Sequence, residues 1–370
     1  MIYIYDASAI IFSGARAARS KYWNNMGFPT GGLYKFLSFM FRDLKSIDKL
    51  GGSIIVALDS DKTYNRKKAY PKYKANRQST GQFAEEEREV IHLQLRVLQE
   101  MLPRIGIPTV QIDGLEADDI IYSLVNDLGQ DNQILIRADD SDLMDTKFLG
   151  KNVTIESVTG RGTLNGCHTI ISKILNGDPT DNYDGIQLPI LKEFLKKEYE
   201  TNKDFIFSQA LPPKTIFPEN ITEADIQIMY RNLYLARPMI VKVYKGHPPK
   251  VEINYDNLEL YLNALACKSF LERNLGKQRD YTSQNVVNLT ADLVGRVPEN
   301  VKKYLNKDTG SYWKRNKTVD LKNANISSGK SMWEKDPIDS SLDKYVNEIE
   351  TDDFEMQESL RTIQSLLGED

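Results

Sequence analysis

Residues 1–12 read MIYIYDASAIIF: a short apolar run, an aspartate at position 6, and a second apolar segment. The run at 2–5 predicts a buried β-strand, because it is short and consists of Ile and Tyr. Similar Ile-, Val- or Leu-rich runs recur at 53–58, 107–112, 133–137 and 153–158. The first half of the chain therefore contains the elements of a buried sheet.

Longer amphipathic segments separate these runs. The clearest is 85–102, where Ile91, Leu95, Leu98 and Leu102 recur at helical spacing behind an acidic first turn. Strands that alternate with helices are typical of an α/β fold, so we predict a mainly parallel central sheet flanked by helices.

Composition restricts the class of protein. The chain has 370 residues, is 41% hydrophobic and contains only Cys167 and Cys267, without a C-x-x-C spacing. Neither a disulfide framework nor a thiolate zinc site is expected, which suggests a reducing cytosol. The N-terminus lacks the features of a signal peptide and no apolar run is long enough to span a bilayer, so we expect a soluble cytoplasmic protein without a membrane partner.

Charge is strongly segregated along the chain. The formal net charge is -4, yet 62–77 holds seven basic and no acidic residues, whereas 334–370 holds twelve acidic and three basic ones. A net value hides such a distribution, and the basic segment is suited to contact phosphates.

Four regions are expected. Residues 1–186 form the α/β core, and 187–275 form a smaller helical region that prolines interrupt. Residues 276–333 are polar and few of them are large and apolar, so we predict a linker there. The acidic tail occupies 334–370.

Acidic residues follow the predicted strands. Because ligand sites of parallel sheets gather at the carboxyl ends of strands, we expect these carboxylates to meet at one rim. They are Asp6, Asp59, Asp140 and Asp142 after three strands, and Glu116, Asp118 and Asp119 in the E-A-D-D group that opens a helix. Asp178 and Asp181, in the loop sequence NGDPTDN, could join them.

Clustered carboxylates repel one another unless a cation with at least two positive charges lies among them. Oxygen ligands without a His or Cys cluster favour Mg²⁺ or Mn²⁺ over zinc. Two such ions would support hydrolysis of a phosphodiester. Taken singly, each Asp is more simply a helix cap or a solvated turn residue, so the prediction depends on the joint pattern.

The ordered motifs resemble the 5′ nuclease family of 5′-to-3′ exonucleases and flap endonucleases, whose core is PIN-like. They are D-A-S at Asp6, G-F-P-T-G-G at Gly27, A-L-D at Asp59, Y-P-K-Y-K-A-N-R at Tyr70, E-A-D-D at Glu116, A-D-D-S-D-L around Asp140 and G-D-P-T-D-N at Gly177. The resemblance implies a site for two Mg²⁺ ions, which Mn²⁺ could replace. The implied ligands are Asp6, Asp59, Glu116, Asp118, Asp119, Asp140, Asp142, Asp178 and Asp181, whereas Asp139 is not carried over.

The resemblance also implies a helical arch near 62–90. At its base Lys74 and Arg77 would contact the scissile phosphate as catalytic residues. The implied nucleic-acid contacts are Arg66, Lys67, Lys68, Lys72 and Tyr73. Cations interleaved with tyrosines independently suit a single-strand channel, although an ordinary solvated basic helix is the alternative.

After Gly185 the chain departs from the family, because YDGIQLPILKEFLKKEYE lacks the glycines of the usual helix-hairpin-helix. The expected region 187–275 is therefore a modified form of that motif, similar to the ribonuclease H of T-even phages, which would place the protein in a bacterial or phage-infected cell. Basic residues and aromatic side chains at 301–330 could touch single-stranded nucleic acid, although a solvated linker is the simpler reading. Phe354, Met356, Leu360, Ile363 and Leu367 form one stripe on the acidic tail, which could dock on the protein's own body or on a sliding clamp or single-strand-binding protein.

The predicted function is a metal-dependent 5′-to-3′ exonuclease and flap endonuclease that removes RNA primers and displaced 5′ ends. Its partners would be DNA and RNA/DNA hybrids with 5′ flaps or ends. The alternatives are a non-catalytic protein that binds branched nucleic acid, a PIN-type ribonuclease and a phosphatase on a related sheet.

Overall fold

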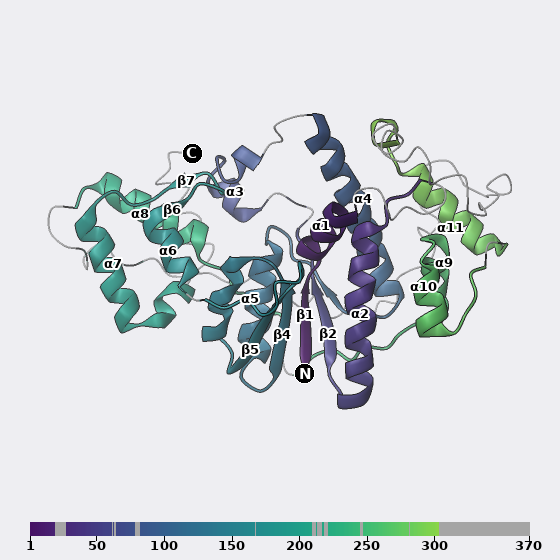
Figure 1. Ribbon diagram of the computed structural model, residues 1–370. Helices are drawn as coiled ribbons and strands as arrows, with labels where there is room; N and C mark the ends of the chain where they lie inside the picture. The colour runs from purple at the N-terminus through teal and green to yellow at the C-terminus, as the bar shows by residue number, and fades with distance from the viewer. Residues whose placement is uncertain are drawn as a thin grey trace.

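The computed structural model describes residues 1–302 except 19–26, 61, 63, 78–81, 167, 209–211, 213–216, 218–220, 245, 246 and 281. Its centre is a parallel sheet with the strand order β3-β2-β1-β4-β5 (Figure 1). The strands are β1 (Ile2–Asp6), β2 (Ser53–Ala57), β3 (Thr109–Val110), β4 (Gln133–Ala138) and β5 (Asn152–Ser157). The predicted α/β class is confirmed.

The register brings the predicted acids to one level. In the centre of the sheet, Ile2 of β1 lies opposite Ser53 of β2 and Ile134 of β4. Asp6 ends β1, while Asp59 and Asp140 follow the last residues of β2 and β4 by two positions. Parallel strands in register therefore deliver these three side chains to the same rim.

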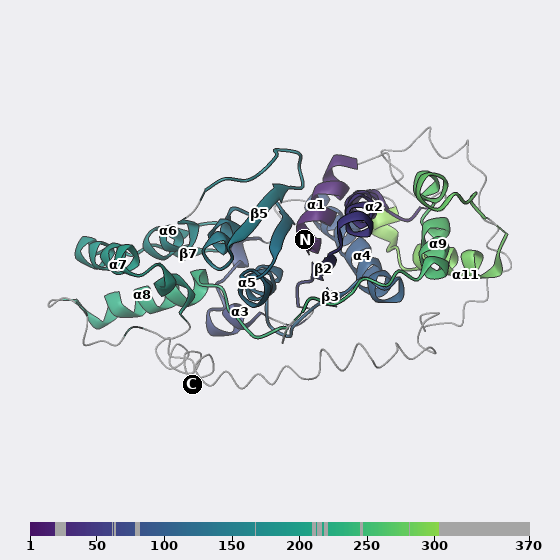
Figure 2. The same cartoon turned by 90° about the horizontal axis from the view of Figure 1, so that it is seen from below.

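Successive side chains of β1 point to opposite faces of the sheet, and the core is accordingly divided into two clusters. Tyr3 and Tyr5 pack with α1 (Ala7–Ala18), α2 (Gly31–Leu50) and α4 (Gln82–Arg104). Ile2 and Ile4 pack on the other face with α5 (Ala117–Leu128) and α6 (Thr169–Asn176). Figure 2 shows α2 and α5 on opposite sides of the sheet. This two-sided burial is the reason that the central strands β1 and β2 are mostly apolar.

Shorter elements surround the rim. They are α3 (Asn65–Ala69), the 3₁₀ helices η1 (Ala75–Arg77) and η2 (Ser141–Phe148), and the antiparallel pair β6 (Gly177–Asp178) and β7 (Tyr183–Asp184). The last pair closes the loop that carries Asp178 and Asp181.

The region 187–275, expected as one unit, is divided between the two ends of the molecule (Figure 1). Near β5 lie α7 (Pro189–Thr201), η3 (Lys203–Phe207) and α8 (Glu223–Ala236), which belong to the cluster around α6. Beside α2 and α4 lie α9 (Tyr255–Ala264), α10 (Lys268–Phe270) and the π-helix η5 (Leu271–Leu275).

An extended segment, 237–254, joins the two groups along a polar stripe of α5. The side chains of Asp119, Ser123 and Asp127 accept hydrogen bonds from the backbone N–H groups of Met239, Val241 and Val243 at 2.8, 3.0 and 2.8 Å. The stripe repeats every fourth residue, so one face of α5 holds the segment.

The predicted linker at 276–333 is wrong in its first part. Helix α11 (Gln284–Gly295) buries Val286, Val287, Leu289 and Leu293, and packs against α9. The polar character of 276–333 as a whole concealed this helix, whose apolar residues mostly share one buried face. Residues 303–333 and the acidic tail at 334–370 lie outside the described residues. Within the described part of the chain, no helix has the length and apolarity needed to cross a membrane.

If α11 is part of the fold, Leu289→Ala should lower the free energy of unfolding by about 2–5 kcal/mol, because Leu289 is 1% exposed within the core. Chemical denaturation measures this change. The control is Asn285→Ala on the exposed face of the same helix. Equal, small effects of both substitutions would restore the linker interpretation.

Candidate active site

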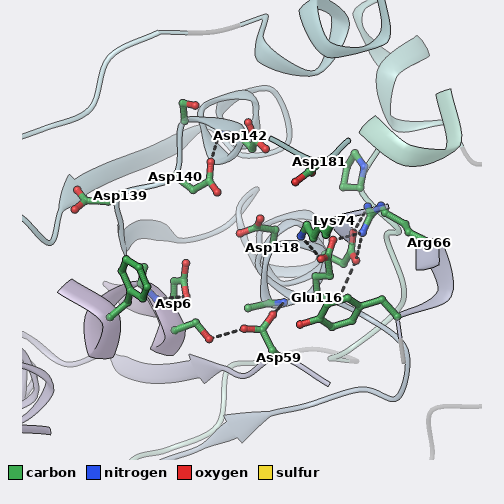
Figure 3. Close-up of a pocket in the computed structure, with 18 of the residues that line it drawn as sticks. Asp6, Asp59, Arg66, Lys74, Glu116, Asp118, Asp139, Asp140, Asp142 and Asp181 are labelled. Carbon is green, nitrogen blue, oxygen red and sulfur yellow. Dashed lines mark hydrogen bonds and ion pairs between the residues drawn. The ribbon is translucent and has the colours of Figure 1, made fainter. Parts of the chain in front are cut away.

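The predicted acids converge on one cavity of about 1230 Å³ at the carboxyl ends of the strands. Figure 3 shows Asp6, Asp59, Asp118, Asp140, Asp142 and Asp181 around a common space. Glu116 and Asp119 also line it. Asp178 lies beside it and is connected to Asp142 through the ammonium of Lys173. The sequence thus located all nine acids at or next to one site.

Local capping aims several of these carboxylates. Asp6 accepts a hydrogen bond from the N–H of Ala9 at 2.9 Å in the first turn of α1, and Asp140 accepts one from Asp142 N at 2.9 Å. Asp59 accepts bonds from Ala117 N at 3.0 Å and from the hydroxyl of Ser8. The capping interpretation is therefore confirmed for Asp6 and Asp140, and it is compatible with the site interpretation, since the cap bonds orient the carboxylates.

One half of the acid cluster is not compensated by protein cations. Within the described ranges, no ion pair joins Asp6, Asp118 or Asp140 to a lysine or arginine. Burial, reinforced by the charges of Asp59 and Asp140, raises the pKa of Asp6 to about 7. Burial and the charges of Asp140 and Asp6 raise the pKa of Asp118 well above its ordinary value. These carboxylates repel one another and lack a counter-ion from the chain.

The other half contains a built-in cation that the sequence reasoning missed. The ammonium of Lys173 on α6 pairs with Asp142 and lies 2.5 Å from Asp178. Despite burial, Lys173 lowers the pKa of Asp178, while burial and Asp140 raise the pKa of Asp142 to about 6. The only signal in the sequence was a single lysine within the apolar helix TIISKIL.

Glu116 is the centre of a buried hydrogen-bond network. Its carboxylate accepts bonds from Arg66 Nη1 and from the Tyr73 hydroxyl, each at 2.9 Å, and pairs with Lys74. Although burial opposes ionisation, the charges of Arg66 and Lys74 lower the pKa of Glu116. This network ties the basic segment 62–77 to the start of α5.

Two residues expected to contact nucleic acid are in fact internal. Arg66 is 5% exposed and Tyr73 is 2% exposed. Arg66 is committed to Glu116 and Asp119, and Tyr73 packs in the core around α5. Both side chains line the cavity, but their burial argues against the predicted contacts with nucleic acid, which stay a prediction. The packing of these side chains against α5 is not visible in the sequence.

Asp119 has a structural position as well. Its oxygens accept four hydrogen bonds: two from Arg66 at 2.7 Å, one from Glu116 N at 3.1 Å and one from Met239 N at 2.8 Å. At 1% exposure, this carboxylate has its acceptor positions filled by the chain itself. We therefore assign it to the scaffold and not to the metal ligands.

The basic segment still offers cations to the cavity. Lys67, Lys68 and Lys72 are exposed, and Lys67 lines the cavity. The Lys74 ammonium lies 4.9 Å from the Tyr73 ring centroid, beside Glu116. The side chain of Arg77 lies outside the described residues. The cavity is also lined by residues to which the sequence analysis assigned no role: Phe12, Arg16, Lys35, Arg88 and His92.

The residues fit a divalent cation by charge and donor type. The uncompensated group is entirely carboxylate, which suits a hard ion. As the side chains lie, no three His, Cys, Asp or Glu residues of the described chain are arranged to enclose an ion. The fit therefore depends on the excess of negative charge and on the oxygen donor set, and not on a preformed coordination shell.

Comparisons with known proteins show which family the chain resembles. Residues 1–165 match the family model of the 5′-3′ exonuclease N-terminal resolvase-like domain. The 5′-3′ exonuclease of Buchnera aphidicola subsp. Acyrthosiphon pisum is 31% identical over 249 residues, covering 62% of this chain and 83% of that protein. DNA polymerase I of Caldicellulosiruptor bescii is 27% identical over 202 residues, covering 50% of this chain and 22% of the polymerase.

A solved structure of the T5 D15 protein, co-crystallized with metal ions, is 19% identical, with a TM-score of 0.44, covering 80% of this chain and 99% of that one. The sequence matches decide the assignment: the chain belongs to the 5′-3′ exonuclease family. It is a nuclease, an enzyme that cleaves phosphodiester bonds.

The raised pKa values predict how stability depends on pH without metal. The folded-state pKa values of Asp6 (about 7) and Asp142 (about 6) exceed the ordinary aspartate value of 3.8. Between these values the folded state binds more protons than the unfolded state. The free energy of unfolding should therefore fall as the pH rises from about 5 to about 8. Melting temperatures in chelator measure this fall.

Added Mn²⁺ should raise the melting temperature more at about pH 8 than at about pH 5, since protons compete for the same carboxylates. A stabilisation by Mn²⁺ that does not change with pH would argue against binding at these acids.

Proposed function

We propose that this nuclease is a divalent-metal-dependent 5′-to-3′ exonuclease and flap endonuclease. It would hydrolyse phosphodiesters at the 5′ ends of DNA or RNA/DNA duplexes, and its role would be removal of RNA primers during replication or repair. The observation that carries the proposal is the cavity itself, in which uncompensated carboxylates face the base of a basic segment.

Mg²⁺ is the proposed ion, with two ions per site and Mn²⁺ as a substitute. Asp6, Asp118 and Asp140, with Asp59 beside them, would hold the first ion, because no lysine or arginine in the described part of the chain forms an ion pair with the first three. Asp142, Asp178 and Asp181 would hold the second, at the position that Lys173 partly neutralises. When bound, the ions supply activated water and stabilise the charge on the leaving oxygen.

The protein's own residues position the substrate. Lys74 pairs with Glu116 at the edge of the cavity, so its ammonium can contact a phosphate without leaving that carboxylate. The exposed Lys67, Lys68 and Lys72 would neutralise phosphates farther along the strand. Arg77 remains a proposed phosphate contact.

The acidic tail at 334–370 is proposed as a docking segment for a sliding clamp or single-strand-binding protein. Deleting it should leave cleavage of a bare oligonucleotide unchanged but weaken stimulation by such a partner.

Asp118→Asn should lower cleavage at least about 100-fold, because the substitution removes a charge that faces the proposed ions. The assay uses a 5′-flap DNA and a 5′-recessed RNA/DNA hybrid, each with Mg²⁺ or chelator, and product lengths separate exonuclease from flap cleavage. Binding of the flap DNA should persist.

The matched comparison is Asp119→Asn, which should lower the melting temperature by breaking the Arg66 pair, whereas Asp118→Asn should not. Wild-type binding of branched DNA without metal-dependent cleavage would favour the non-catalytic alternative. Cleavage of single-stranded RNA alone would favour the PIN-type ribonuclease.

A further inference from the structure

Two motifs about a hundred residues apart are joined by three hydrogen bonds. The first motif is 72–76, at the base of the basic segment, and the second is the loop 179–182. Lys74 N donates to the carbonyl of Asp181 at 3.0 Å. Asn182 Nδ2 donates to the carbonyl of Lys72 at 2.8 Å, and Asn76 Nδ2 donates to the carbonyl of Pro179 at 2.6 Å. We call this set of bonds the cross-clamp.

Backbone conformation marks the same place. Lys74 has a φ of 56° and Asn182 a φ of 64°, both in the left-handed region. Asparagine tolerates this region, but lysine seldom adopts it. The backbone N–H of Lys74 donates to the carbonyl of Asp181 in this conformation. The hydrogen bond to the loop therefore stabilises a backbone conformation that is otherwise unfavourable for lysine.

The loop is the more rigid of the two partners. The carboxylate of Asp178 accepts bonds from Thr180 N at 2.8 Å and Asp181 N at 3.3 Å. Gly177, with a φ of 74°, packs so closely on Gly185 that a Cβ would lie 2.4 Å from its nitrogen. Asn232 of α8, fully buried, donates to the carbonyls of Ile174 and Asp184 at 3.0 Å and so holds both ends of the loop.

The other partner is short and is exposed at its ends. In the segment 72–76, Tyr73 is buried in the core, whereas Lys72 and Asn76 are exposed, and the segment leads into a single 3₁₀ turn, η1. The cross-clamp therefore ties the exposed ends of this segment to the loop. The segment carries Lys74, whose ammonium pairs with Glu116 at the cavity.

We propose that Asn182 and Asn76 are positioning residues that couple the loop carrying Asp178 and Asp181 to the placement of Lys74. This inference depends on the proposed function, in which Asp178 and Asp181 bind an ion and Lys74 contacts a phosphate. Ion binding at the two acids would then influence where the Lys74 ammonium lies. The asparagine of G-D-P-T-D-N thereby has a role distinct from that of the two aspartates.

Hydrogen exchange tests the coupling without any turnover. Mn²⁺ is added to the full-length protein, and exchange is followed in peptides covering 72–76 and 177–184. In the wild type, Mn²⁺ should slow exchange in both segments by at least several-fold, since local opening exposes these amides. The variant Asn182→Gly keeps the left-handed backbone but loses the side-chain carboxamide that donates to Lys72. In this variant, protection by Mn²⁺ should persist in 177–184 and be lost in 72–76.

Kinetics test whether the asparagines act through Lys74. Asn182→Gly and Asn76→Ala should each lower kcat on the 5′-flap substrate by on the order of 10-fold, the scale of one lost hydrogen bond. In a Lys74→Ala background the same substitutions should cost no further activity, whereas independent effects would multiply. Asn176→Ala, beside the loop and outside the cross-clamp, is the control and should match the wild type.

The outcomes separate the two proposals. Protection of 177–184 without protection of 72–76 in the wild type, or multiplying effects with Lys74→Ala, overturns the coupling and leaves the proposed function intact. Protection of neither segment, together with no cleavage by the wild type, overturns both.

Discussion

The buried guanidinium of Arg66 is the interaction on which the rest of the site depends. It binds both oxygens of Asp119, one oxygen of Glu116 and the carbonyl of Arg237, so α3, α5 and the segment after α8 meet at one charge. Removing one partner of such a pair leaves a buried charge uncompensated, at a cost of about 3–5 kcal/mol. The network therefore fixes the start of α5, from which Asp118 faces the cavity.

Compensation of charge divides the acids into two groups. Glu116, Asp119 and Asp178 have protein cations beside them, and arginine or lysine holds the pKa of Glu116 and of Asp178 low. Burial raises the pKa values of Asp6 and Asp118 instead, and the charges of neighbouring carboxylates raise them further. Without a bound cation, the clustering of Asp6 and Asp118 with other carboxylates would only destabilise the folded state. The uncompensated group is thus the part of the site that favours a metal most strongly. Glu116 and Asp119 belong to the frame around it, and Asp178 lies at the proposed second ion position that Lys173 partly neutralises.

The sequence was most informative where one residue's position follows from its strand. Because parallel strands end at one rim, Asp6, Asp59 and Asp140 could be placed from the strand pattern alone, and the strands themselves were predicted to within a few residues. It failed where function depends on the direction of a side chain. Arg66 and Lys67 are neighbours in one basic run and both line the cavity, yet Arg66 is buried and Lys67 is exposed. Lys173 and α11 were missed for a related reason, since only packing reveals which residues they contact.

The chain has a net charge of -4, so its binding to a polyanion depends on how its charges are distributed. Exposed Lys67, Lys68 and Lys72 can attract phosphates at long range, but at short range the approaching strand meets Asp6, Asp118 and Asp140. Without a cation these carboxylates repel the phosphate more strongly the deeper it enters, because screening by water weakens inside the cavity. Cations bound among the acids invert the sign of that field at the place where the chemistry occurs. If the proposed contacts and metal site hold, the lysines would determine encounter with nucleic acid, and metal occupancy would determine whether the scissile phosphate can reach the rim of the sheet.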